Sequence, residues 1–218
     1  MRAGQPWGEP LPPDARVVDV DGDDTDFTVA AVAHPDAVLR FTPSPASDLA
    51  RALGLTPGTP PAGDTVVTCD LLHLGHGMVA ANAVVLGVPP ARLRPWHRLT
   101  PVRVEVDGRF LVEEPATTVV VANGQFLRGA DLVPRGHPGD GRLEVQVYSV
   151  RPGERRAMRS RLASGDHVPH PRILEASGRH IGIQWLAGEQ PVEVDGHPLA
   201  TSSDIGVDVD PGAVKVLI

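Results

Sequence analysis

The sequence predicts an α+β fold, in which a small α/β segment at residues 1–62 precedes a β-rich, sandwich-like domain at residues 63–218. Gly and Pro number 23 each, and this abundance of turn-forming residues favours short strands over long helices. Strand-like and helix-like stretches alternate before residue 56, whereas short apolar runs separated by turn signals follow residue 63. The Pro- and Gly-rich stretch between them, residues 56–63 (TPGTPPAG), marks the boundary. The final strand is expected either to close the second domain or to return to the first.

The first segment has the pattern of two strand–helix units. Asp24 or Thr25 is the expected N-cap of the first helix, because a side-chain oxygen there can accept from free backbone N–H groups. Ser47 is the expected N-cap of the second helix, and Gly54 lies near its end. The expected elements are a strand at residues 16–20, an acidic turn at 21–24, a helix at 27–33, a strand at 37–42 and a helix at 47–55.

The second segment consists mainly of predicted strands. Residues 102–106 alternate apolar and polar side chains and then reach Asp107 and Gly108, a pattern typical of a β-hairpin. One helix is expected, at residues 153–164 (GERRAMRSRLAS). The other expected strands are residues 66–74, 78–86, 117–122, 143–150, 180–186, 191–194 and 214–218.

Composition excludes several classes of protein. The net charge is −7, so a general nucleic-acid binder is not expected. The single cysteine, Cys69, rules out an intrachain disulfide and a thiolate metal cluster. The start of the chain lacks a signal-peptide pattern, and no apolar run approaches the roughly 18–20 residues that span a bilayer. We therefore expect a cytoplasmic protein that is at most peripheral to a membrane.

The second segment carries a resemblance to a known family, in stretches that keep their order and spacing. The first stretch is an apolar run that contains an Asp and ends at an Asn. A strand that ends in Asn-Gly follows it, and then come a Gly-Asp-Gly turn, an Asp-Gly turn and the last strand. Together they resemble the second domain of diacylglycerol kinases and sphingosine kinase-like lipid kinases, which belong to the NAD kinase-like superfamily. The stretches are residues 66–82 (VVTCDLLHLGHGMVAAN), 118–134 (TVVVANGQFLRGADLVP), 139–147 (GDGRLEVQV), 163–173 (ASGDHVPHPRI), 192–197 (VEVDGH) and 210–218 (DPGAVKVLI).

The first segment resembles the family's nucleotide-binding half in a shortened and altered form. Residues 48–51 (DLAR) match the end of the family's Gly-Thr-Gly-Asn-Asp-Phe-Ala-Arg motif, whereas residues 44–47 (SPAS) replace its glycines and asparagine. Residues 21–25 (DGDDT) stand in place of Gly-Gly-Asp-Gly-Thr. The family also begins with a further strand and helix, for which this chain has no room. The resemblance implies binding of ATP and Mg²⁺, with contacts from Gly22, Asp23, Thr25, Ser47 and Asp48.

The altered loops oppose ordinary nucleotide binding. Phosphate loops use glycine because the backbone must approach the anion closely. Pro45 has no N–H to donate, and the carboxylates of Asp19, Asp21, Asp23 and Asp24 repel a triphosphate unless Mg²⁺ lies between them. The alternative interpretation of residues 19–24 is a solvated acidic turn.

The resemblance also implies roles for residues of the second segment. Asp195 matches the family's general base for the lipid hydroxyl, and His197 replaces the accompanying Glu. The alternative is that Asp195 and Gly196 form a tight hairpin turn. Asp140 matches an acidic position associated with a structural Mg²⁺ in relatives, and it equally suits a plain turn.

Arginines crowd the predicted helix at residues 153–164. Arg155, Arg156 and Arg159 accompany an apolar side formed by Met158 and Leu162. A basic amphipathic helix can lie on anionic lipid headgroups, and the same pattern also suits a solvated face. The sequence leaves both interpretations open.

Two functions of different class follow. The first is an ATP- and Mg²⁺-dependent kinase that phosphorylates a lipid hydroxyl with Asp195 as the base. The second is a non-catalytic relative that keeps the β-rich domain to bind a lipid, a lipid-like small molecule or a partner protein. The sequence leaves the oligomeric state, including a homodimer, undecided.

Overall fold

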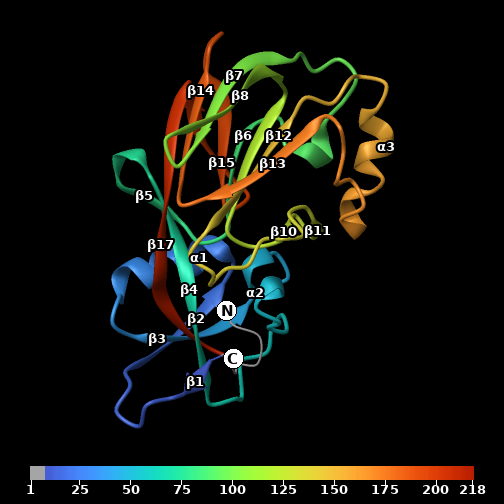
Figure 1. Ribbon diagram of the computed structural model, residues 1–218. Coiled ribbons are helices and arrows are strands. Elements are labelled where there is room, and N and C mark those ends of the chain that lie inside the picture. Colours follow the sequence, from blue (N-terminus) through green and yellow to red (C-terminus); the bar gives the residue numbers. More distant parts are fainter. Residues whose placement is uncertain (1–7) are drawn as a thin grey trace.

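The first segment folds as the predicted α/β unit, and the computed structural model describes residues 8–218 of the chain (Figure 1). Strands β2 (Val17–Gly22) and β3 (Val38–Pro43) pair in parallel. Helix α1 (Asp24–Ala33) connects them, and α2 (Asp48–Ala52) follows β3. Because parallel strands end at the same edge of a sheet, the turns that begin α1 and α2 lie close together.

Both helices begin at a side-chain cap, and one cap differs from the prediction. The N-cap of α1 is Asp23, not Asp24 or Thr25. Its carboxylate accepts from the N–H groups of Thr25 and Asp26, and the Asp26 carboxylate accepts from the N–H of Asp23. This reciprocal capping box satisfies N–H groups of the first turn, whereas the Asp24 carboxyl accepts from Ser47 and from the start of α2. Ser47 caps α2, as predicted.

The remaining strands form the predicted sandwich of two sheets and a separate small hairpin. The nine-stranded sheet has the order β1-β4-β17-β14-β7-β8. In addition, β5 pairs with β4, β3 pairs with β17, and β2 pairs with β3. Its further members are β1 (Glu9–Pro10), β4 (Thr65–Leu74), β5 (Met78–Ala80), β7 (Thr100–Val106), β8 (Arg109–Ala116), β14 (His180–Trp185) and β17 (Asp204–Leu217). The six-stranded sheet has the order β13 (Ile173–Gly178), β12 (Leu143–Tyr148), β9 (Thr118–Ala122), β6 (Ala83–Gly87), β15 (Gln190–Val194) and β16 (His197–Ser202). The hairpin is β10 (Phe126–Leu127) and β11 (Ala130–Asp131), and the 3₁₀ turns are Gly75–Gly77, Pro90–Arg92 and Leu162–Ser164.

The last strand is much longer than predicted. β17 pairs antiparallel with β4 along most of its length, and near its end it also pairs in parallel with β3, where Lys215 lies opposite Val38. Pro211 and Gly212 suggest a turn in the sequence, but the register with β4 shifts there instead, so the strand bulges and continues. β4 and β17 therefore run from the sandwich into the first segment (Figure 1). The division predicted between residues 62 and 63 stays a prediction.

The strand predicted over residues 78–86 is interrupted. β5 ends at Ala80 and pairs with β4, whereas β6 begins at Ala83 in the other sheet. The backbone N–H groups of Ala81, Asn82 and Ala83 donate to one distant carboxylate, that of Asp195, instead of to a neighbouring strand. The chain crosses between the sheets at this point.

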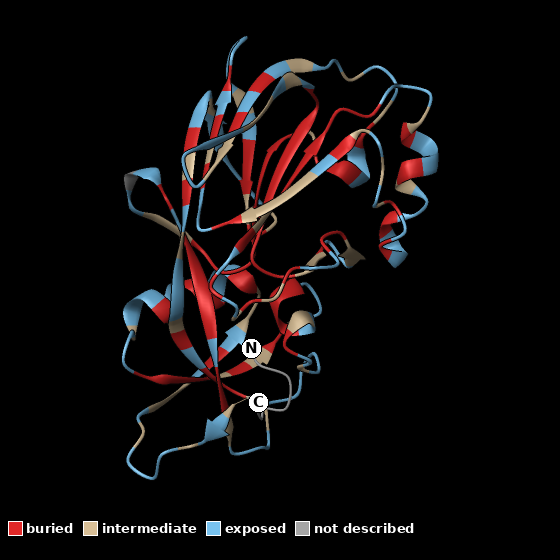
Figure 2. Cartoon of the chain, in the orientation of Figure 1, coloured by how far each residue is buried: buried red, intermediate tan, exposed pale blue. Residues whose placement is uncertain are grey.

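The buried residues form three main groups. One lies between the two sheets, one lies under α1 and α2, and one lies on the outer face of the six-stranded sheet (Figure 2). The outer face is covered in part by α3 (Arg155–Arg159), which is shorter than the helix predicted over residues 153–164 because the following residues form only a 3₁₀ turn. Among residues 8–218 no helix is long and apolar enough to cross a membrane.

Candidate active site

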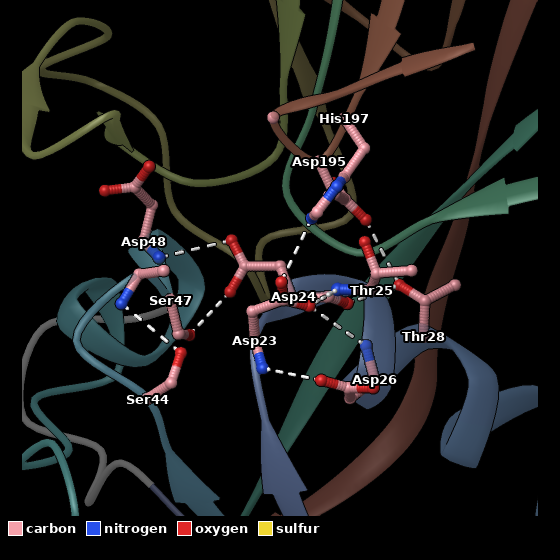
Figure 3. A network of polar contacts seen from close by, with 12 residues as sticks. Asp23, Asp24, Thr25, Asp26, Thr28, Ser44, Ser47, Asp48, Asp195 and His197 are labelled. Carbon is pink, nitrogen blue, oxygen red and sulfur yellow. Dashed lines mark hydrogen bonds and ion pairs between the residues drawn. The ribbon is translucent and has the colours of Figure 1, made fainter.

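Three turns that are distant in sequence converge at one place (Figure 3). The β2–α1 turn supplies Asp23, the β3–α2 turn supplies Ser47 and Asp48, and the β15–β16 turn supplies Asp195 and His197. The parallel ends of β2 and β3 account for the first two turns, and β15 approaches them through its pairing with β6. Five of the residues predicted for the site are thus brought together.

Asp24 is the most informative side chain of the group. It is buried, with 4% of its surface exposed, and its carboxyl lies over the start of α2. It accepts from the Ser47 hydroxyl at 2.5 Å and from the N–H groups of Asp48 and Leu49 at 3.2 Å each. Burial raises the pKa of Asp24 to about 7, opposed by the Ser47 hydrogen bond and reinforced by the charge of Asp195. The interpretation of Asp24 as part of a solvated turn is therefore wrong, although Asp19 and Asp21 are exposed.

Asp195 is both a turn residue and a buried acceptor. Its backbone has a φ of 48°, in the left-handed region, at the turn between β15 and β16. One carboxylate oxygen accepts from the N–H groups of Asn82 and Ala83 at 2.9 Å each. The other accepts from the N–H of Ala81 at 2.8 Å and from the Thr28 hydroxyl at 3.2 Å. Burial raises its pKa, and the four hydrogen bonds act in the opposite direction.

His197 contacts the first segment directly. Its Nε2 lies 3.0 Å from Oδ2 of Asp23, and the imidazole is largely exposed. Partial burial raises the pKa of Asp23, but the hydrogen bonds from His197 and from the N–H groups of Asp26 and Thr25 outweigh it and lower the pKa below its ordinary value. The pair therefore connects the β15–β16 turn to the start of α1.

Asp48 holds the β10–β11 hairpin on α2. Its carboxylate accepts from the N–H of Gly129 at 2.8 Å and from the N–H of Arg128. Arg51 completes the contact by donating to the Gly129 carbonyl at 2.6 Å and by lying 4.2 Å from the centre of the Phe126 ring. Every one of these contacts is made within the chain.

Arg128 and Glu193 belong to the site and were missed by the sequence analysis. The Arg128 guanidinium donates to Glu193 at 2.5 Å and to the Gly196 carbonyl at 3.2 Å, so it supports the turn that carries Asp195. Arg92 lies 3.3 Å from the other oxygen of Glu193. Only the Arg-Gly pair at the hairpin tip is visible in the sequence, and it signals a turn rather than a site.

The other predicted nucleotide contacts serve the cap of α1. Gly22 has a φ of 140°, and a Cβ there would lie 1.9 Å from an oxygen of the Asp26 carboxylate, so only glycine leaves room for the capping box. Thr25 is exposed in the first turn of α1, and its N–H donates to Asp23.

Asp140 lies apart from this site. Its carboxylate accepts from the N–H of Arg142 at 3.0 Å, as a turn residue does. Within residues 8–218 no group of three or more His, Cys, Asp or Glu side chains is placed to hold a metal ion. The metal role of Asp140 stays a prediction.

Arg155 corrects the predicted membrane helix. It is fully buried, and its guanidinium donates to the carbonyls of Val150, Arg94 and His97 at 2.6–3.0 Å. A buried guanidinium cannot reach lipid headgroups, so its assignment to a membrane surface is wrong. Arg156 is exposed and Arg159 is half-buried.

The residues of the converging turns do not fit a nucleoside triphosphate with Mg²⁺. The N–H groups at the start of α2, which would face a phosphate, donate to Asp24 instead. Pro45 has no N–H, and the carboxylates of Asp24, Asp48 and Asp195 already accept from donors of the chain. The Arg128 guanidinium beside these turns is already paired with Glu193, so it does not offset the charge of the carboxylates.

The fold and the converging turns define a protein of the NAD kinase-like class, built from an α/β unit and a β-sandwich. The family described as the YegS C-terminal NAD kinase beta sandwich-like domain matches residues 90–218, which is more than half of the chain, and the protein belongs to this family. A search of curated proteins found no match.

Solved structures share the fold along nearly the whole chain. Three structures from Bacillus anthracis str. Sterne, two described as a "putative diacylglycerol kinase" and one as a diacylglycerol kinase, each cover 92% of this chain. Their TM-scores are 0.72, 0.74 and 0.70, with sequence identities of 17%, 18% and 20% and coverage of 77%, 77% and 75% of the other chain. At these identities the similarity establishes the fold.

Proposed function

We propose that this protein is a non-catalytic relative of the diacylglycerol kinases that keeps the two-part fold as a lipid-binding module. The observation that carries the proposal is the position of Asp24. Its carboxyl occupies the N–H groups of Asp48 and Leu49 and the hydroxyl of Ser47, which are the donors that a phosphate would need at the start of α2. An internal acceptor there competes with any phosphate.

The substitution responsible can be identified. In the Gly-Gly-Asp-Gly-Thr motif that residues 21–25 resemble, glycine stands where this chain has Asp21 and Asp24. Asp21 is exposed, so an aspartate in place of glycine there does not alter the interior of the protein. Asp24 is buried and fills the space over α2. Glycine at position 24 would leave those donors free, so the change from glycine to aspartate both removes space and adds negative charge.

The kinase alternative rests on the convergence of Asp23, Asp48 and Asp195. A general base must reach the proton of its substrate through a free oxygen lone pair. Each oxygen of Asp195 accepts from two donors of the chain, and the side chain is 9% exposed. This geometry favours a structural role for Asp195, in which it holds the crossing between β5 and β6.

Nucleotide binding tests the proposal. The purified full chain is unfolded by heat with and without millimolar Mg-ATP, and the parent midpoint is expected to stay unchanged because no ligand binds the folded state. For Asp24→Gly, the thermal midpoint is expected to be higher with Mg-ATP than without it. Asp21→Gly is the matched control, since it also replaces a carboxyl group of the motif with glycine but does not free the donors at α2.

Two results would contradict the proposal. A clear rise in the parent midpoint with Mg-ATP would mean that the altered loops hold phosphates despite Asp24. Equal rises for Asp24→Gly and Asp21→Gly would mean that the loss of negative charge, and not the release of donors at α2, controls binding.

A further inference from the structure

Positive charge is concentrated at one end of this acidic protein. Residues 90–99 and 151–161 contain eight arginines and one acid, Glu154, in a chain whose 27 acidic residues outnumber its 20 basic ones. Glu154 itself lies 3.3 Å from Arg172. We call these two stretches the arginine-rich end. They lie where the chain enters β7 and where α3 covers the outer face of the six-stranded sheet (Figure 1).

Arg155 joins the two stretches into one surface. From α3 its Nη1 donates to the carbonyls of Arg94, Pro95 and His97 at 2.6, 3.3 and 2.7 Å. His97 also accepts from the N–H of Arg94 at 3.0 Å. The loop between residues 94 and 99 is therefore held from the inside by a buried side chain, which fixes its shape without a strand or helix of its own.

The loop presents a large aromatic side chain to solvent. Trp96 is 74% exposed, more than any other large hydrophobic residue in the part of the chain that the structure describes. Leu99, three residues later, is 36% exposed, and Arg98 between them is also exposed. Because Arg155 holds the backbone of this loop, Trp96 and Arg98 are presented to solvent from a fixed position.

Several arginines of the arginine-rich end are left without a carboxylate partner in the part of the chain that the structure describes. Arg94, Arg98 and Arg156 form no ion pair within residues 8–218, although the protein has an excess of carboxylates. Charge of one sign that the protein itself leaves uncompensated attracts a surface of the opposite sign.

We propose that the arginine-rich end docks on an anionic lipid bilayer, with Trp96 at the level of the headgroups and Arg98 and Arg156 against their phosphates. The proposal rests on the lipid-binding part of the proposed function and names the surface that carries it. Tryptophan prefers the membrane–water interface because its ring is apolar and its N–H is polar. Arginines near an anionic leaflet add electrostatic attraction that salt weakens. The net charge of −7 opposes the binding of a long polyanion such as nucleic acid, whereas a bilayer contacts the protein only at its arginine-rich end.

Vesicle co-sedimentation tests the proposal with the full chain. The protein is expected to sediment with vesicles of phosphatidylglycerol and phosphatidylcholine and to stay in solution with phosphatidylcholine alone, with binding that falls as salt rises. Arg98→Gln is expected to weaken binding about fivefold, and Trp96→Ala at least as much. Both side chains are exposed, so thermal midpoints equal to that of the parent confirm folding.

Matched controls lie at the other end of the β7–β8 hairpin. Phe110 is 64% exposed and Arg109 is exposed, and both follow the turn at Asp107 and Gly108, roughly 20 Å along the strands from the loop. Phe110→Ala and Arg109→Gln are expected to leave vesicle binding unchanged. Equal losses in these variants and in Trp96→Ala would overturn the proposal.

Absence of binding to anionic vesicles would also overturn it and would leave a protein partner as the occupant of this surface. The assay contains no nucleotide, so its failure leaves the result with Mg-ATP untouched. Conversely, a rise in the parent midpoint with Mg-ATP would refute the non-catalytic assignment and would not affect vesicle binding. The two failures are therefore distinguishable.

Discussion

Removing the Asp195 carboxylate is expected to destabilise the protein strongly. Asp195→Ala leaves three buried N–H groups, those of Ala81, Asn82 and Ala83, without the acceptors that now lie at 2.8–2.9 Å. An unsatisfied buried donor costs roughly 1–3 kcal/mol. The cost of the three unsatisfied N–H groups exceeds the free energy that is regained when the carboxylate is no longer buried. Burial of this carboxylate is unfavourable, as its raised pKa indicates. We expect a loss of roughly 3 kcal/mol or more in the free energy of unfolding, a large share of the roughly 5–15 kcal/mol of an ordinary domain.

Urea unfolding followed by circular dichroism measures this loss. Asp195→Asn is the graded variant, since it keeps one acceptor oxygen, and we expect it to lose about 1–3 kcal/mol. Asp21→Ala, an exposed acid of the neighbouring turn, is the control and should stay within about 0.5 kcal/mol of the parent. If Asp195→Ala were as stable as this control, the carboxylate would not support the β5–β6 crossing, and the case for a catalytic base would return.

Three further predictions concern other buried charges. Burial raises the pKa of Asp24 from 3.8 to about 7, so the folded state holds this proton more tightly than the unfolded state and the protein loses stability as pH rises between those values. Asp24→Asn has no such proton, so its free energy of unfolding minus that of the parent should increase by about 4 kcal/mol across this pH range. Arg155→Met should lower the free energy of unfolding by about 2–4 kcal/mol and speed proteolysis of residues 94–99, whereas the exposed Arg156→Met should change stability by less than about 0.5 kcal/mol. Asp70→Ala should cost about 2–4 kcal/mol in urea unfolding, because Asp70 accepts from two N–H groups at 2.6 and 2.7 Å, and Asp140→Ala should cost under about 1 kcal/mol.

The buried charges also explain why the sequence could locate the site without describing it. The motifs single out Asp23, Asp48 and Asp195, which the fold brings to one place, whereas the roles assigned to them stay predictions. Their partners come from far along the chain: Asp195 accepts from residues more than 100 positions away, and Asp48 from the hairpin tip about 80 positions away. Acidic residues in turns usually face water, so local sequence gives no sign that Asp24 turns inward.

The sequence by itself determined the features that depend on neighbouring residues. The alternation of apolar side chains and the turn signals specify the α/β unit, the sandwich and the hairpin at Asp107 and Gly108, and a side chain beside free N–H groups specifies the Ser47 cap. Only the tertiary structure decided the bulge that extends β17, the burial of Arg155 and the position of Asp24 over α2. Each of these depends on a partner from another part of the chain, and whether a charge is buried or solvated is set by the donors and acceptors that folding brings to it.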